Sequence, residues 1–349
     1  MKYLHGGMPS YYFKKFNISE RPVIDFSVNI NPIGPPPVIK EIWNELLQKI
    51  SIYPDIEGKG IRQFYREKFH IPEDFVLPGN GSTEIIYLLS RMLPAKKILI
   101  LKPSYFDYER ATILAKKEVL SLYTDPVSEI EEKELIKCLY KADAIWIGRP
   151  NNPTGKLLPK ELILSLAKDF PEKWIILDEA FIQFVKDWER ETFISSEIPK
   201  NIFVIHSLTK FYALAGIRAG ALISRPGNIS LISEGKEPWS VNILAEEIAK
   251  RLVFCREYEE ETISLISTER ERVYNALLQS EDIEPIKSEA NFILCRYKDS
   301  LDKLLSYLMQ NGIYVRDCRN FDGLDGDFFR IGIRRPKENE LLLSMLISI

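Results

Sequence analysis

Three polar or charged side chains follow apolar runs of the sequence, at places where an enzyme could use them. Asn152 lies in RPNNPTG after the run AIWIG, Asp178 follows WIIL, and Lys210 lies in SLTKFYALAGIRAG after IFVIH. If these runs are strands of one sheet, the side chains meet, because ligands bind at the carboxyl ends of strands in α/β sheets. A carboxylate at a strand end is costly to bury unless a cation pairs with it. Asp178 and Lys210 are therefore candidates for a carboxylate and an amine that act together.

An amine and a carboxylate at one sheet edge suit the chemistry of pyridoxal phosphate. The lysine amine forms a Schiff base with this cofactor, and a carboxylate beside the pyridine nitrogen keeps that nitrogen protonated, so that the ring accepts electrons from Cα. Each residue also has an ordinary interpretation. Asn-Pro and Thr-Gly form turns, an aspartate after a strand caps a helix, and a loop lysine is usually solvated. The order of all three residues and their position at strand ends favour the cofactor site.

The elements that position these residues alternate between strand and helix. The apolar runs are continuous, which is typical of strands buried on both faces of a mostly parallel sheet. Helical patterns cover 41–50, 61–69, 83–92 and 158–169, so we expect an α/β fold with helices on both faces of the sheet. The strand candidates are Lys97–Leu101, Ala144–Gly148, Trp174–Asp178, Ile202–His206 and Gly220–Ile223.

After Trp239 the pattern changes and predicts a smaller α+β domain. We expect a large domain at 41–235, a small domain at 236–349, and residues 1–40 joining the small domain. The prolines of NINPIGPPP predict an extended link between the two packed regions. The later elements are one long helical stretch at Ala245–Leu278, strands at Phe292–Tyr297 and Phe328–Ile333, and a helix at Leu301–Asn311.

The composition of the 349 residues, 45% hydrophobic and 28% charged, fits a soluble globular protein. A net charge of -3 gives no reason to expect a nucleic-acid or membrane partner. The four cysteines and three histidines lack the spacing of metal ligands, so no metal site is expected. No signal peptide and no apolar run of roughly 20 residues is visible, and we expect a cytoplasmic protein.

The motifs NNPTG, LDEAF and SLTKFYALAGIRAG resemble those of the pyridoxal-phosphate-dependent aminotransferase family of fold type I. The resemblance covers essentially the whole chain and implies a pyridoxal 5'-phosphate cofactor. It implies that Lys210 is the Schiff-base lysine and Asp178 the partner of the pyridinium. Asn152 is then expected to hydrogen-bond the ring hydroxyl. Tyr105 in KPSYFDY is expected to stack on the ring face, unless it is a core aromatic.

The cofactor phosphate needs N–H donors and positive charge. Ser82 and Thr83 lie in GNGSTE, where a glycine-rich turn leads into a helix whose N-terminus favours an anion. A capping box with a nearby glutamate is a compatible interpretation. The resemblance adds Ser207, Thr209 and Arg218 to Ser82 and Thr83. We call this set of five residues the phosphate cup.

The resemblance also implies contributions from beyond the cup. Tyr53 matches a tyrosine that reaches the phosphate from a second subunit, so the active enzyme is expected to be a homodimer. Arg330 in FFRIGIR matches an arginine that pairs bidentately with an amino-acid carboxylate. Arg316 in YVRDC matches a position that binds the distal group of the substrate. A surface arginine is the alternative at both positions. His206 departs from the residue types common in relatives, and we expect it to influence phosphate affinity.

Within the family, the sequence is more similar to threonine-phosphate decarboxylases of cobalamin biosynthesis than to histidinol-phosphate aminotransferases. The shared features are His5-Gly6-Gly7, DFSVNINPIG, EPWSVN, VRDC with NFDGLD, FRIGIR, and Phe181 where these transaminases usually carry a tyrosine.

The resemblance implies a lyase that converts L-threonine O-3-phosphate to (R)-1-amino-2-propanol O-2-phosphate. His5 and Asn31 would help to hold this substrate beside Arg316 and Arg330, although His5 could instead be a disordered terminal residue. Two alternatives stay open. One is an aminotransferase acting on histidinol phosphate or aromatic amino acids. The other is a non-catalytic binding protein, against which the intact Lys210 argues.

Overall fold

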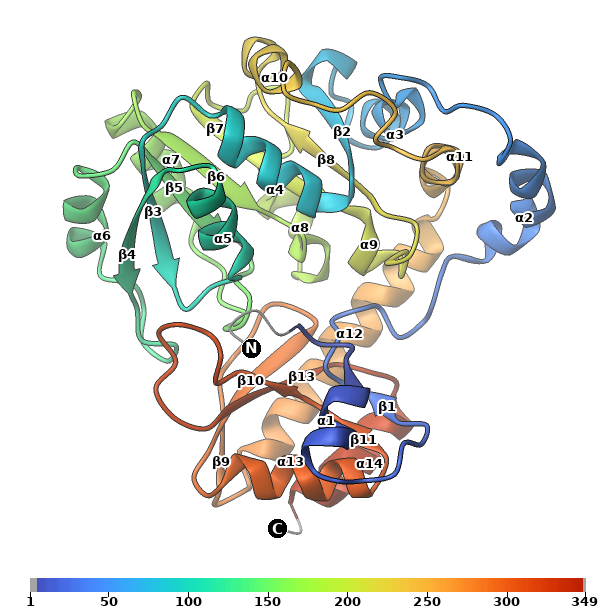
Figure 1. The fold of residues 1–349 in the computed structure, drawn as a ribbon, viewed down its shortest axis with the longest axis vertical. Helices are drawn as coiled ribbons and strands as arrows, with labels where there is room; N and C mark the ends of the chain where they lie inside the picture. The colour runs from blue at the N-terminus through green and yellow to red at the C-terminus, as the bar shows by residue number, and fades with distance from the viewer. Residues whose placement is uncertain (1–4, 348–349) are drawn as a thin grey trace.

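A seven-stranded, mostly parallel sheet dominates the larger part of the molecule and confirms the predicted α/β class (Figure 1). The computed structural model describes residues 5–347. The strand order is β2-β8-β7-β6-β5-β3-β4, in which only β8 runs antiparallel to its neighbours among the described residues. The strands are β2 (Val76–Asn80), β3 (Lys97–Lys102), β4 (Glu118–Tyr123), β5 (Ala144–Gly148), β6 (Trp174–Asp178), β7 (Ile202–Ser207) and β8 (Ala219–Ile223).

Helices cover both faces of this sheet. Consecutive residues of a central strand enter different cores, with Ile145 in one apolar cluster and Trp146 in the other. The continuous apolar runs of the sequence follow from this two-sided burial. The Trp146 face carries α4 (Gly81–Met92), α5 (Asp107–Leu114) and α10 (Pro226–Ser233). The opposite face carries α3 (Lys59–Phe69), α6 (Glu132–Leu139) and α7 (Lys160–Asp169).

Short elements carry the chain between the strands of the large sheet. α9 directly follows β7 and therefore begins at the carboxyl end of a strand. The remaining elements of this part are α2 (Pro37–Lys49), the 3-10 turns η1 (Glu73–Phe75) and η2 (Ile182–Phe184), α8 (Trp188–Glu191) and α9 (Leu208–Phe211).

A second, antiparallel sheet lies below the first in Figure 1, with the strand order β12-β13-β10-β9. The N-terminal segment joins this part, because β1 pairs in parallel with β11. The elements are α1 (Pro9–Lys15), β1 (Ile24–Asp25), β9 (Ile283–Pro285), β10 (Phe292–Tyr297), α13 (Leu301–Gln310), β11 (Ile313–Tyr314), β12 (Arg316–Asp317), β13 (Phe328–Gly332) and α14 (Pro336–Leu346).

The prediction of a single helical stretch at 245–278 is wrong, because the chain forms two helices there. α11 (Ile243–Leu252) ends in a turn, where Phe254 and Cys255 donate backbone hydrogen bonds three residues back. α12 (Arg256–Leu277) then begins in a new direction. The two helices pack against different partners, α11 against α2 and α3, and α12 against α14. We therefore propose that the two structural units meet at this break rather than at residue 235.

Between residues 5 and 347, no helix is both long enough and apolar enough to cross a bilayer.

Candidate active site

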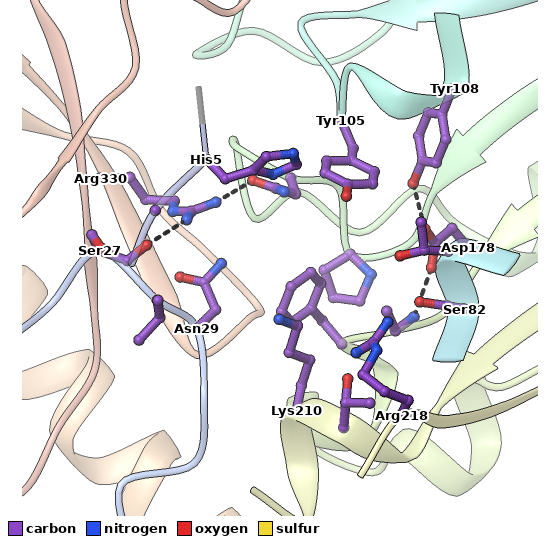
Figure 2. A pocket seen from close by; sticks show the side chains of 18 residues that line it. His5, Ser27, Asn29, Ser82, Tyr105, Tyr108, Asp178, Lys210, Arg218 and Arg330 are labelled. Atoms are coloured by element: carbon purple, nitrogen blue, oxygen red, sulfur yellow. Dashed lines mark hydrogen bonds between the residues drawn. The ribbon is translucent and has the colours of Figure 1, made fainter. Parts of the chain in front are cut away.

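A cavity of about 190 Å³, partly open to solvent, lies between the large sheet and the small sheet (Figure 2). Its walls come from the carboxyl ends of β5 and β6, from α4, α5 and α9, from the N-terminal segment and from β13. The residues predicted from the sequence that line it are His5, Ser82, Thr83, Tyr105, Asn152, Asp178, Thr209, Lys210, Arg218 and Arg330. The predicted residues that do not line it are Asn31, Tyr53, Ser207 and Arg316.

Lys210 presents an amine that has no hydrogen-bond or salt-bridge partner within residues 5–347. Burial lowers the pKa of this amine to about 8, assisted by the guanidinium groups of Arg330 and Arg218, while Asp178 opposes the shift. About a tenth of the amine is therefore uncharged at pH 7, far more than for an ordinary lysine. An uncharged amine in a cavity can act as a nucleophile or as a base.

Asp178 ends β6 with both carboxylate oxygens held by donors. Oδ2 accepts a 2.7 Å hydrogen bond from the phenol of Tyr108, and Oδ1 accepts a 3.0 Å bond from the backbone N–H of Ala180. Burial raises the pKa of Asp178, whereas these two donors and Lys210 lower it. The carboxylate is thus fixed in orientation at the cavity wall, where it could pair with a cationic ring nitrogen.

The turns after β5 and β6 are tied to each other beneath the cavity. The backbone N–H of Arg149 donates a 2.8 Å hydrogen bond to the carbonyl of Asp178. The Arg149 guanidinium lies 3.5 Å from the Glu179 carboxylate, and both side chains are fully buried. This pairing holds the turn that carries Asn152 against the strand end that carries Asp178.

The first turn of α4 forms an anion site together with Arg218. Gly81 has a φ of +76°, and a Cβ at that position would lie 2.4 Å from Arg218 Nη2. Glycine therefore lets the guanidinium approach the helix N-terminus. The hydroxyls of Ser82 and Thr83 line the cavity, and neither makes a side-chain hydrogen bond to any residue from 5 to 347. Free N–H groups, hydroxyls and a guanidinium together suit a phosphate.

The side chains at the start of α4 do not form the capping box considered from the sequence. Instead, the Glu84 carboxylate accepts from the backbone N–H of Asn80, one residue before the helix. Ser207 acts as the N-cap of α9, since its hydroxyl accepts from the backbone N–H of Thr209 and bonds the Thr209 hydroxyl at 2.7 Å. Ser207 is thus one layer behind Thr209 relative to the cavity.

The expectation that His206 influences phosphate affinity is wrong. Its ring lies on the α3 face of β7, where Nδ1 makes a 2.8 Å hydrogen bond with the Tyr65 phenol. Complete burial lowers the pKa of His206 to about 3. The ring is therefore a neutral core group on the far side of the strand from the phosphate cup, because successive side chains of a strand point to opposite faces.

On the small-sheet side, Arg330 is a buried guanidinium that forms no salt bridge with any residue from 5 to 347. It donates to Asn152 Oδ1 and, at 3.0 Å, to the Ser27 carbonyl, and it lies 4.9 Å from the centre of the Phe292 ring. Its Nε is buried without a hydrogen-bond partner, and burial lowers the pKa of the guanidinium to about 10. Such a group favours an anion in the cavity.

Arg316 stands opposite Arg330 in the register of β12 and β13. Its guanidinium donates to Asn320 Oδ1 at 2.7 Å and lies 5.3 Å from the centre of the Phe321 ring. Arg316 contributes to lowering the pKa of both Arg330 and His5. Its charge therefore reaches the cavity, although its side chain is not part of the wall. Direct contact with a substrate stays a prediction.

The N-terminal segment brings His5 to the cavity beside two aromatic side chains. The imidazole lies 4.6 Å from the Phe106 ring and 6.1 Å from the Tyr105 ring, and burial lowers its pKa. The next residue, Gly6, is needed for this path, because a Cβ there would lie 2.4 Å from the Ser27 carbonyl oxygen.

The expected substrate contact of Asn31 is not met. Its amide nitrogen is within 2.8–2.9 Å of the Phe211 carbonyl, the Tyr258 hydroxyl and the Thr262 hydroxyl, outside the cavity. Asn31 instead ties the N-terminal segment to α9 and α12. Asn29 lines the cavity in its place, with a buried Oδ1 that lacks a hydrogen-bond partner.

Sequence reasoning also missed Tyr108 as a site residue. Tyr108 follows Tyr105 by three positions, across the turn that leads into α5, where its backbone N–H donates to the Tyr105 carbonyl. This spacing is a signal that could have identified it. Phe181 lines the cavity as well and packs edge-to-face on Phe292 at 5.1 Å. No comparable spacing signal marks Asn29, because its segment is neither helix nor strand.

Tyr53 lies outside the cavity and is 81% exposed. Its ring is 5.5 Å from that of Trp239. A role at the phosphate therefore requires that it act on another chain.

Comparisons with known proteins identify the family of the chain. Residues 21–346 match the family model described as aminotransferase class I and II. The chain is 31% identical over 356 residues to threonine-phosphate decarboxylase of Salmonella typhimurium, covering 99% of this chain and 96% of that protein. It is 35% identical to a protein of Caldanaerobacter subterraneus subsp. tengcongensis provisionally named as a threonine-phosphate decarboxylase, covering 91% and 88%. The solved histidinol-phosphate aminotransferase of Clostridium acetobutylicum is 34% identical, with a TM-score of 0.87 and coverage of 93% and 98%.

Proposed function

The chain belongs to the aminotransferase class I and II family, and on that basis we propose that it decarboxylates L-threonine O-3-phosphate. The product of this reaction is (R)-1-amino-2-propanol O-2-phosphate, and the reaction belongs to cobalamin biosynthesis. The cofactor is pyridoxal 5'-phosphate. When bound, it supplies an electron sink for the pair left at the substrate Cα when a bond to that carbon breaks.

The described residues fit this cofactor. The unpartnered amine of Lys210 suits its aldehyde, and the fixed carboxylate of Asp178 suits its pyridine nitrogen. Asn152 would hold the ring hydroxyl and Tyr105 would cover one ring face. In this proposal the phosphate binds to the remaining group of donors, which comprises Ser82, Thr83, Thr209 and Arg218, with Ser207 behind them.

The observation that carries the substrate proposal is the buried guanidinium of Arg330 near Lys210, which forms no salt bridge with any of residues 5–347. Arg330 lines the side of the cavity opposite the phosphate cup (Figure 2), and Arg316 stands next to it in the sheet, behind the cavity wall. They suit a substrate that carries two anionic groups, a carboxylate and a phosphate. L-Threonine O-3-phosphate has both, whereas histidinol phosphate has no carboxylate.

Residues of the chain then orient and protonate the substrate. Arg330 binds the carboxylate, and Arg316 with His5 attracts the phosphate. Loss of carbon dioxide leaves a Cα that needs a proton. Lys210, whose amine has a pKa of about 8, can hold that proton at the cavity and deliver it. Phe181 adds an apolar wall in this arrangement.

Phosphorus NMR tests the proposal. The purified protein, loaded with pyridoxal phosphate, is incubated with L-threonine O-3-phosphate, and in parallel with histidinol phosphate and 2-oxoglutarate. We expect conversion of the first substrate without any keto acid. Inertness in the first tube together with glutamate formation in the second would instead identify an aminotransferase, the activity that the similarity to histidinol-phosphate aminotransferases supports.

We also propose that the active form is a homodimer. Large apolar side chains are exposed along α2, along the segment that follows it, and at Trp239, and a cluster of exposed apolar side chains is typical of a protein interface. Tyr53 lies within this surface, so a second copy seated there could receive Tyr53 at its own phosphate cup. The exposed residues are Trp43, Leu47, Ile50, Ile52, Tyr53, Ile56 and Trp239.

A further inference from the structure

We infer that Tyr108 is a positioning residue, whose phenol fixes the orientation of the Asp178 carboxylate and keeps it ionised for the pyridine nitrogen of the cofactor. The inference rests on the proposed cofactor and is independent of which reaction follows. No role was expected for Tyr108 from the sequence. It contacts the cofactor's partner rather than the substrate.

The geometry that supports this role is rigid on both sides of the hydrogen bond. The Tyr108 ring is buried and stacks on Trp146, with ring centres 4.9 Å apart and planes within 2°. Trp146 lies in the middle of β5, so the stack fixes the phenol relative to the sheet. The hydroxyl then donates to Asp178 Oδ2 at 2.7 Å (Figure 2). With the Ala180 N–H on Oδ1, the plane of the carboxylate is set by two donors.

The Tyr108 phenol helps to keep the buried Asp178 carboxylate ionised. Burial raises the pKa of Asp178, and the groups that lower it are the Tyr108 hydroxyl, the Ala180 N–H and the Lys210 ammonium. Burial and the neighbouring carboxylate raise the pKa of Tyr108 well above its ordinary value, so the phenol stays a donor. Without the phenol, the proton shared by Asp178 and a ring nitrogen moves toward the carboxylate, because the ionised form of Asp178 loses one of its donors.

The packing role of Tyr108 can be separated from its hydrogen bond. Tyr108→Phe keeps the ring and its stack on Trp146 and removes only the hydroxyl. Tyr87→Phe is the matched control, because the Tyr87 hydroxyl donates at 2.8 Å to Asp107, on the same helix as Tyr108, rather than to Asp178. Both variants lose one phenol oxygen from the same pair of packed helices, α4 and α5.

The experiment loads the wild-type protein and both variants with pyridoxal phosphate labelled with ¹⁵N in the ring. In Tyr108→Phe we expect the nitrogen resonance to move toward the unprotonated position and the cofactor affinity to fall about tenfold, the effect of losing a hydrogen bond to a charged group. In Tyr87→Phe both readouts should match the wild type. A purely structural role for Tyr108 would lower the unfolding temperature without moving the nitrogen resonance.

A double-mutant cycle provides the second test. In an Asp178→Asn background, Tyr108→Phe should change cofactor affinity by less than about twofold, because the phenol acts through the carboxylate. An unchanged nitrogen resonance in Tyr108→Phe, or an equal loss of affinity in the Asp178→Asn background, overturns the inference. If the wild-type protein binds no pyridoxal phosphate, the cofactor assignment itself fails and the inference falls with it, so the two failures are distinguishable.

Discussion

The Lys210 amine and the Arg330 guanidinium lie at one cavity, and no carboxylate of residues 5–347 pairs with either of them; this arrangement sets their chemistry. The nearby positive charge helps to lower the pKa of Lys210 to about 8. The lone carboxylate of the cavity floor, Asp178, is held by donors on both oxygens. An anionic substrate would relieve the repulsion among the cations and raise the pKa of Lys210, so substrate binding and protonation of the amine are coupled.

Arg330→Lys tests the carboxylate contact. A lysine keeps the charge but loses the planar fork, which binds a carboxylate bidentately and also reaches Asn152 and the Ser27 carbonyl. We expect KM for L-threonine O-3-phosphate to rise at least tenfold. The affinity for pyridoxal phosphate should stay within about twofold, because Arg330 lies away from the phosphate cup. Steady-state kinetics and a cofactor titration measure both; an unchanged KM would contradict the role.

His206 predicts how the stability of the protein depends on pH. Its pKa is about 3 in the folded protein and 6.5 as a model value. The unfolded chain therefore takes up a proton below pH 6.5 that the folded chain refuses, and stability is lost as pH falls from 6.5 toward 3 by up to about 1.4 kcal/mol per pH unit. Denaturant unfolding at pH 7 and pH 5 should show this slope, and it should shrink in His206→Gln. The exposed His70, substituted as His70→Asn, serves as control; an equal slope in His206→Gln would assign it to other groups.

At the scale of elements, the central strands were predictable and the edges were not. β5 and β6 have the expected bounds because continuous apolar runs leave little choice. β2 was missed because Pro78 and Gly79 interrupt VLPGN, and it forms by pairing with β8 at the sheet edge. β4 was missed because its burial is partial along its length, as for an edge strand. β2 depends on a partner far along the chain, whereas β4 pairs only with the preceding strand β3 among the described residues.

The same distinction applies to the candidate site. Residues at strand ends and helix starts, such as Asp178, Lys210 and Ser82, line the cavity as local motifs indicated. The assignment within 29–31 was wrong, because the choice between Asn29 and Asn31 depends on contacts with α9 and α12. The long helix at 245–278 failed for a similar reason, since the direction of each half is set by the surface on which it packs.

Gly81→Ala tests the approach of Arg218 to α4. Alanine at a φ of +76° is strained, and its Cβ would meet Arg218 Nη2 at 2.4 Å. We expect the affinity for pyridoxal phosphate to fall at least tenfold as the guanidinium is displaced from the phosphate cup. Gly227→Ala, where nothing lies within 4 Å of the new Cβ, is the control and should bind the cofactor normally. Fluorescence titration measures both; normal binding by Gly81→Ala would show that Arg218 does not need this approach.

At the scale of the whole molecule, the cavity is built from both sheets and from the N-terminal segment, so no single element forms the site (Figure 1). Arg330 comes from β13 of the small sheet, Lys210 from α9 directly after β7 of the large sheet, and His5 from the N-terminal segment. Tyr53 is exposed outside this cavity, which is why a second copy is proposed to complete it.

Subunit complementation tests the dimer. Lys210→Ala removes the amine, and Tyr53→Ala removes the tyrosine proposed to act on the partner, so each variant alone should be impaired. A refolded equimolar mixture contains hybrid dimers in which one site has both residues, and up to about a quarter of wild-type activity should return, since half of the dimers are hybrids with one intact site. Light scattering should give twice the chain mass. A mixture no more active than its components would mean that Tyr53 does not act across an interface.

We propose that the protein breaks the bond between Cα and the carboxylate of a substrate bound in this cavity. The most direct measurement incubates the cofactor-loaded protein in D₂O with L-threonine O-3-phosphate labelled with ¹³C at the carboxylate, without any keto acid. We predict one labelled carbon dioxide for each aminopropanol phosphate formed, and one deuterium at the former Cα. Label that stays in the organic product, with turnover only after 2-oxoglutarate is added, would contradict the claim and identify a transaminase.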